Sequence, residues 1–131
     1  DMLTNKDKNL FATVGGLSFN PVENYDTFSD KDVISQDDLN FKVIHTPGHT
    51  QGSVCFLCGD SLFSGDTLFK MSIGRTDLPG GSMDDMLNSL QKINSISDNV
   101  TIYPGHGDYT NLDFEKKNNM YLKGNLYDDF I

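Results

Sequence analysis

The sequence is poor in positively charged residues. Its 131 residues include 10 Lys and Arg against 19 Asp and Glu, which gives a net charge of −9 with neutral histidines. This excess of negative charge would repel a polyanion such as DNA or RNA, so we expect no nucleic-acid partner. A chain of this length can bury one hydrophobic core, and we expect residues 1–131 to form a single domain.

Long apolar runs are also absent. No stretch approaches the roughly 20 consecutive apolar residues of a membrane span, and no basic start leads into an apolar segment of the secretory kind. These absences predict a cytoplasmic protein without a membrane partner. The chain begins at Asp1 rather than at a Met, from which we expect processing, degradation or a deliberate cut upstream.

Cysteine is scarce as well. The two cysteines, Cys55 and Cys58, lie in a run typical of a strand rather than of a turn that could fold two thiolates onto one metal. There is no second Cys pair, and no His flanks the run. The pattern favours reduced thiols packed in a sheet over a zinc knuckle or a redox pair.

Hydrophobic periodicity predicts both strands and helices. Three short apolar or alternating runs predict a hairpin-rich sheet with one buried face: 39–44, 54–57 and 61–63. Helical spacing over 82–96, with Ser82 and Asp85 as a capping box, predicts a helix. A buried strand follows at 100–103.

Weaker patterns surround this central part. The segments 2–14 and 112–122 predict helices, and the polar segment 18–31 predicts a loop. A loop of that length in a compact domain is often functional.

Three turns, each directly after a predicted strand, carry a His or an Asp. Pro-Gly-His occurs twice, ending at His49 and at His106, and Gly-Asp-Thr places Asp66 between them. Proline fixes one backbone angle and glycine permits a tight bend, so each imidazole has little freedom left to lose. Ligand-type side chains at three strand ends predict a metal site.

The order of these turns resembles the second half of the metallo-β-lactamase superfamily, most closely the short glyoxalase II-like hydrolases. The resemblance runs from about Leu39 to Leu122. It implies an α+β fold, the αββα sandwich of that family, here as a partial domain holding the second half with its hairpin-rich sheet and flanking helices. The first-half motif of the family, His-x-His-x-Asp-His, is absent, because the only histidines are His45, His49 and His106.

The resemblance implies a role for each turn residue. His49 matches a ligand of the first metal, Asp66 the carboxylate that bridges both metals, and His106 the last ligand of the second metal. Two cations about 3.5–4 Å apart activate a bridging water and polarise a carbonyl oxygen together. Asp66 would also orient that water, so we name it as the catalytic residue. The implied cofactor is zinc, two ions in the intact enzyme, with iron or manganese as alternatives.

Four more residues are candidates for the surroundings of the metals or the substrate pocket. His45 lies four residues before His49, a spacing that does not bring two rings together in a strand and turn, so we expect it to pack or to support a ligand. Arg75 and Asp77 form either an exposed ion pair or a pair that shapes the pocket. Tyr109 matches the tyrosine that follows the last metal ligand in glyoxalase II enzymes, with one extra residue in between.

The implied function is a metal-dependent hydrolase of thioesters or related small acyl compounds in the intact protein, with a small-molecule substrate. Two alternatives stay open: a mononuclear iron enzyme like the persulfide dioxygenases, which share the Gly-Arg-Thr-Asp run, and a non-catalytic interaction module. Three ligands divided between two metals leave fewer than three for each, so we expect this piece alone to bind zinc weakly and to be inactive.

Loss of the first half has a structural consequence too. Because the family fold packs two sheets face to face, the resemblance implies an apolar sheet face open to water. We expect a homodimer partner or the missing N-terminal half to cover it.

Overall fold

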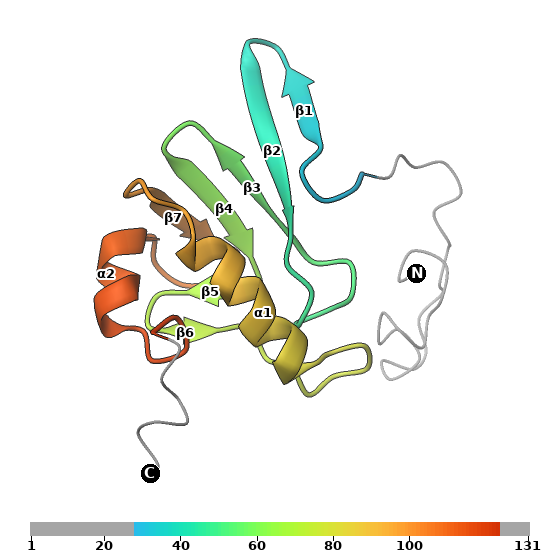
Figure 1. Ribbon diagram of the computed structural model, residues 1–131, viewed down its shortest axis with the longest axis vertical. Helices are drawn as coiled ribbons and strands as arrows, with labels where there is room; N and C mark the ends of the chain where they lie inside the picture. Colours follow the sequence, from blue (N-terminus) through green and yellow to red (C-terminus); the bar gives the residue numbers. More distant parts are fainter. Residues whose placement is uncertain (1–27, 124–131) are drawn as a thin grey trace.

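A six-stranded mixed sheet is the main element of the computed structural model, which describes residues 28–123 (Figure 1). The strand order is β1-β2-β3-β4-β7-β8. The strands are β1 (Val33–Gln36), β2 (Leu39–His45), β3 (Val54–Cys58), β4 (Ser61–Gly65), β7 (Thr101–Pro104) and β8 (Thr110–Asn111). A small hairpin of β5 (Leu68–Phe69) and β6 (Ser72–Ile73) follows β4 in the chain.

Strands β2, β4 and β7 run in the same direction. β2 and β4 are each antiparallel to β3, which lies between them, and β7 pairs with β4 in parallel. The connection from β4 to β7 contains the β5–β6 hairpin and the helix α1 (Met83–Asn94). The C-terminal ends of β2, β4 and β7 therefore meet at one edge of the sheet.

Helix α1 covers one face of the sheet (Figure 1). Its N-cap Ser82 accepts a hydrogen bond from the backbone N–H of Asp85, which confirms one half of the predicted capping box. The reciprocal half does not form, because the N–H of Ser82 donates to the carbonyl of Gly48. The helix buries Met86, Leu90 and Ile93 completely. Together with strand residues they form the core: Ile44, Cys55, Leu62, Leu68, Met86, Leu90, Ile93, Val100, Ile102, Leu112 and Leu122.

The other face of the sheet carries a row of aromatic rings, which we call the aromatic face: Phe28, Phe41, Phe56, Phe63, Tyr103 and Tyr109. Side chains alternate between faces along a strand, so Phe63 and Tyr103, paired across β4 and β7, lie on the same side. Their rings stack with centroids 5.5 Å apart. Phe63, Tyr103 and Tyr109 are 40%, 43% and 69% exposed. Within residues 28–123, no second layer packs over these rings.

The structure corrects the predicted closing helix. It was expected over 112–122, but α2 ends at Asn118 and spans Leu112–Asn118. Asn119 has an extended backbone, and its side chain donates hydrogen bonds to Glu115 and to the carbonyl of Ser72, which ends the helix.

Several short strands were not predicted from the sequence. β1 and the two-residue strands β5, β6 and β8 are too short to show a clear period. The predicted helix at 2–14 and most of the predicted loop at 18–31 lie outside the described residues. No helix within residues 28–123 has the length and apolar character needed to cross a bilayer.

Candidate metal centre

Three strand ends bring His49, Asp66 and His106 together. His106 Nε2 lies 3.1 Å from Asp66 Oδ1, and His49 Nε2 lies 3.5 Å from Asp66 Oδ2. Each imidazole thus faces a different oxygen of one carboxylate. The exposed fraction of the side chain rises from 21% for His49 to 39% for Asp66 and 76% for His106. The group therefore opens towards solvent on the His106 side.

The turn after β2 is anchored to α1 and to its N-cap. The carbonyl of Gly48 accepts from Ser82 N at 2.8 Å, and the carbonyl of Pro47 accepts from Ser89 Oγ at 2.6 Å. A Cβ on Gly48 would lie 2.6 Å from Met86 Cα, so only glycine allows this approach to the helix. Both contacts fix the position from which His49 extends.

A backbone carbonyl fixes the orientation of the His49 ring. His49 Nδ1 lies 2.8 Å from the carbonyl oxygen of Arg75. Because a carbonyl oxygen only accepts hydrogen bonds, Nδ1 must carry the proton in this contact, and the lone pair then lies on Nε2. Nε2 is the atom that faces Asp66, so the nitrogen that could bind a metal lies beside the carboxylate.

Asp66 is held by close backbone contacts on both sides. Gly105 N donates to the carbonyl of Gly65 at 2.8 Å, which ties the turn before His106 to the turn that carries Asp66. On the other side, a Cβ on Gly74 would lie 1.7 Å from the carbonyl oxygen of Asp66. The glycines of both neighbouring turns allow the backbone to approach this closely.

The donor set fits a metal ion. Imidazole nitrogen and carboxylate oxygen are ligands that zinc, iron and manganese accept in proteins. Two ligand atoms about 2.1 Å from a tetrahedral zinc stand about 3.4 Å apart, close to the 3.1 Å and 3.5 Å separations of the two His–Asp66 pairs. Within residues 28–123, however, no group of three His, Cys, Asp or Glu side chains is placed to hold one ion. Each ion would have one imidazole and one carboxylate oxygen from this part of the chain.

His45 lies apart from this group. Its ring Nε2 is 2.8 Å from the carbonyl oxygen of Gln51, its backbone N–H donates to Asp30, and its carbonyl accepts from Lys92. These contacts fix the end of β2 and the start of the turn that leads to His49.

Arg75 and Asp77 form a two-point ion pair at the surface. Arg75 Nε and Nη2 donate to the two carboxylate oxygens of Asp77 at 2.7 and 2.9 Å. These hydrogen bonds lower the pKa of Asp77 and raise that of Arg75. Both side chains are more than 60% exposed, so the pair itself contributes little to stability. The contribution of Arg75 to the site is its carbonyl oxygen, which holds His49.

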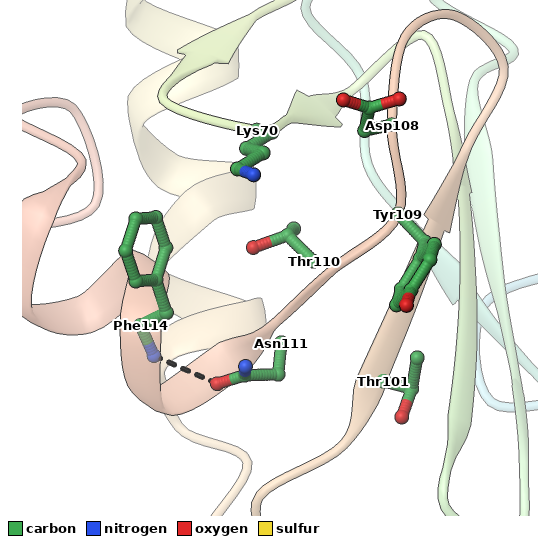
Figure 2. A pocket seen from close by; sticks show the side chains of 7 residues that line it. All are labelled: Lys70, Thr101, Asp108, Tyr109, Thr110, Asn111 and Phe114. Carbon is green, nitrogen blue, oxygen red and sulfur yellow. Dashed lines mark hydrogen bonds between the residues drawn. The ribbon is translucent and has the colours of Figure 1, made fainter.

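Tyr109 lines a pocket together with residues of β7, β8 and α2 (Figure 2). The pocket measures about 460 Å³, and Lys70 and Phe114 lie across from Tyr109. Asp108, two residues after His106, also lines it, but none of the three candidate ligands does. The candidate ligands therefore do not form this pocket, and Asp108 is the lining residue nearest to them in the sequence.

Sequence reasoning missed three contributions to the site. The carbonyl of Arg75 orients His49, the ring of Phe69 contacts that of His106 edge to face at 5.8 Å, and the buried Glu115 supports the turn next to Phe69. A main-chain carbonyl leaves no signal in a sequence. Glu115 left a weak one, because it shares a helix face with the buried Leu112.

Comparison with known proteins identifies the family. The model of the metallo-beta-lactamase superfamily matches residues 2–106. Hydroxyacylglutathione hydrolase GloC of Haemophilus influenzae is 37% identical over 94 residues, which cover 70% of this chain and 44% of that protein. BaeB of Bacillus velezensis, a probable polyketide biosynthesis zinc-dependent hydrolase, is 41% identical over 93 residues, which cover 67% of this chain and 41% of BaeB.

Solved structures share the fold. BLEG-1, a B3 metallo-beta-lactamase, superposes with a TM-score of 0.81 at 33% identity, covering 92% of this chain and 60% of that one. The di-iron-bound form of TTHA1623 gives 0.74 at 34% identity, covering 86% and 56%. ETHE1 from Myxococcus xanthus gives 0.72 at 33% identity, covering 79% and 48%.

The chain therefore belongs to the metallo-beta-lactamase superfamily and has an α+β, partial metallo-β-lactamase fold. Its matched part spans less than half of the length of the curated relatives GloC and BaeB. Metal is named for two of these proteins, zinc for BaeB and iron for TTHA1623.

Proposed function

We propose that this chain supplies His49, Asp66 and His106 to a dinuclear metal site that hydrolyses thioesters or related small acyl compounds. The observation that carries the proposal is the division of one carboxylate between two imidazoles, with Oδ2 facing His49 and Oδ1 facing His106. A carboxylate placed in this way can serve two cations at once, and the hydrolase names of GloC and BaeB support the reaction class.

Each residue has a task in this scheme. Bound zinc ions supply an activated water near neutral pH and polarise the substrate carbonyl. Asp66 keeps its two oxygens directed at the two histidines, and the carbonyl of Arg75 keeps the His49 lone pair directed inward. The exposed side of His106 leaves room for a small-molecule substrate, and Tyr109 with Lys70 offers it a pocket.

The remaining ligands must come from polypeptide other than residues 28–123. We infer that this polypeptide packs on the aromatic face, because its exposed rings form a layer without charged side chains. The N-terminal half of the family domain is the partner that this scheme requires. Without it, two copies would associate through the same face.

Zinc titration followed by NMR tests the metal site in the chain itself. The chain has three histidines, and we expect zinc to shift the ring resonances of His49 and His106 but not those of His45. Asp66→Asn should weaken both responses, whereas the matched control Asp38→Asn, at an exposed carboxylate in the β1–β2 turn, should leave them unchanged. An equal response of all three rings, or full zinc binding by Asp66→Asn, contradicts the proposal. Turnover of a thioester by the isolated 131 residues would contradict the need for further ligands.

A second candidate is a mononuclear iron enzyme of the persulfide dioxygenase kind. The likeness to ETHE1 and the Gly-Arg-Thr-Asp run at Arg75 favour it. Metal analysis of the longer protein separates the two candidates: two zinc ions with thioester hydrolysis support the hydrolase, and a single iron with oxygen consumption supports the dioxygenase.

A further inference from the structure

Glu115 is a carboxylate buried without a cation. Its side chain in α2 is fully inaccessible, and among residues 28–123 no lysine or arginine forms an ion pair with it. Three neutral groups donate to it instead: Met71 N at 2.8 Å and Asn119 Nδ2 at 3.0 Å to Oε1, and Thr110 Oγ1 at 2.7 Å to Oε2. Burial of a carboxylate costs several kcal/mol unless such donors offset it, so these hydrogen bonds are a built arrangement.

The donors belong to the two segments that follow the ligand turns. Met71 lies in the turn between β5 and β6, the hairpin that begins two residues after Asp66. Thr110 begins β8, four residues after His106. Glu115 therefore joins the segment that follows Asp66 to the segment that follows His106.

The hold on the β5–β6 turn is tight. Met71 has a φ of 64°, a conformation that is unfavourable for a residue other than glycine, and its N–H is the group bound by Glu115. Asn119 reinforces the contact, because its Nδ2 also donates to the carbonyl of Ser72 at 3.1 Å. One carboxylate and one amide thus bind both the N–H and the C=O side of the turn.

The β5–β6 turn also supports the candidate metal centre. Phe69, two residues before Met71, places its ring perpendicular to that of His106 with centroids 5.8 Å apart. We propose that Glu115 is a positioning residue: by joining the β5–β6 turn to β8, it keeps Phe69 against His106 and keeps His106 within 3.1 Å of Asp66. The metal-binding meaning of this geometry rests on the proposed function, but the positioning itself can be tested without metal.

The experiment measures the ring resonances of the three histidines in the metal-free chain, with a chelator present and at a fixed alkaline pH, so that protonation does not contribute. The Phe69 ring current shifts His106 away from its denatured-chain position. Glu115→Ala should move the His106 resonance towards that position and leave His45 in place. Glu115→Gln should restore the native position, because its amide oxygen can accept from Met71 and Asn119 while its NH₂ donates to Thr110.

Matched controls separate positioning from general loss of stability. Ile93→Val and Ile93→Ala remove a small and a larger volume from the buried core side of α1. Their losses of thermal stability serve as a lower and an upper comparison for the loss caused by Glu115→Ala. We expect neither to move His106. If Glu115→Ala does not fold, Thr110→Val takes its place, because it removes only the hydrogen bond from β8 to Glu115. The proposal then predicts the same movement of the His106 resonance in Thr110→Val.

Three results overturn the proposal. The first is a His106 ring resonance that stays in place in a folded Glu115→Ala or in Thr110→Val. The second is a His106 shift in Ile93→Ala equal to that in Glu115→Ala. The third is a His106 shift in Glu115→Gln as large as that in Glu115→Ala. A failed zinc titration would count against the proposed function and leave this test untouched.

Discussion

Replacement of Gly74 by alanine should damage the fold and the candidate metal centre together. The new Cβ would lie 1.7 Å from the carbonyl oxygen of Asp66 and 2.8 Å from its carbonyl carbon. Real Cβ contacts essentially never fall below 3.0 Å, so the two backbone segments must separate by 3.0 − 1.7 = 1.3 Å. The atoms in collision are backbone, which cannot rotate away as a side chain would.

The cost follows from the contacts that this separation disturbs. Overpacking of a well-packed site costs about 1–3 kcal/mol, and the hydrogen bond from Gly74 N to the carbonyl of Thr67 adds about 1 kcal/mol if it breaks. We expect a total of about 3 kcal/mol. For a chain of this size, that loss lowers the melting temperature by roughly 10 °C.

Gly52→Ala is the matched control for thermal unfolding followed by circular dichroism. A Cβ on Gly52 meets nothing within 4 Å, so its melting temperature should stay within about 3 °C of the original. The ring resonances of His49 should also move in Gly74→Ala, because the same loop holds its Nδ1. If the two glycine variants melt within about 2 °C of each other, the reasoning about this close approach is wrong.

Three further predictions concern other parts of the molecule. Burial raises the pKa of the Cys55 thiol to about 11, so a thiol reagent at about pH 8 should label one cysteine of the native chain and spare Cys55; equal labelling rates would contradict this. The hydrogen bond from the backbone N–H of His45 lowers the pKa of Asp30 in the folded chain. The stability that the ionised Asp30 contributes is therefore present above its unfolded pKa of 3.8 and is lost as the pH falls through its folded pKa. Asp30→Asn should flatten the decline of the urea midpoint between about pH 5 and pH 3. Phe63→Ser on the aromatic face should weaken self-association measured by light scattering, whereas the control Phe114→Ser on α2 should not. An original chain that stays monomeric at high concentration would contradict association through this face.

Local signals in the sequence made the three candidate turns recognisable, and the structure brings their side chains together. Pro-Gly-His and Gly-Asp turns are short sequence features, and antiparallel hairpins with one parallel crossover bring the ends of β2, β4 and β7 to one edge whatever the details of packing. Helix α1 was predictable from Ser82 and from its apolar spacing.

Non-local contacts account for what was missed. Glu115 follows a charged helix pattern in the sequence, and only the tertiary contact with Met71 and Thr110 accounts for its burial. The end of α2 depends on the same network, because Asn119 leaves the helix to bind Ser72.

Strands β4 and β7 carry rings of the aromatic face and also lead into the turns of the candidate ligands, so packing on this face and metal binding would be linked. Phe63, in β4, lies three residues before Asp66, and Tyr103, in β7, lies three residues before His106. A polypeptide that packs on these rings and carries further ligands would reach the metals, so its binding and zinc binding would strengthen each other by the same factor.

A second copy of this chain would cover the face but would bring no His-x-His-x-Asp-His motif. We therefore expect the zinc affinity of the chain, measured by competition with an indicator, to be equal at chain concentrations below and above self-association. An affinity that rises with chain concentration would mean that a second copy supplies ligands, and the inference that they come from a different polypeptide would be wrong.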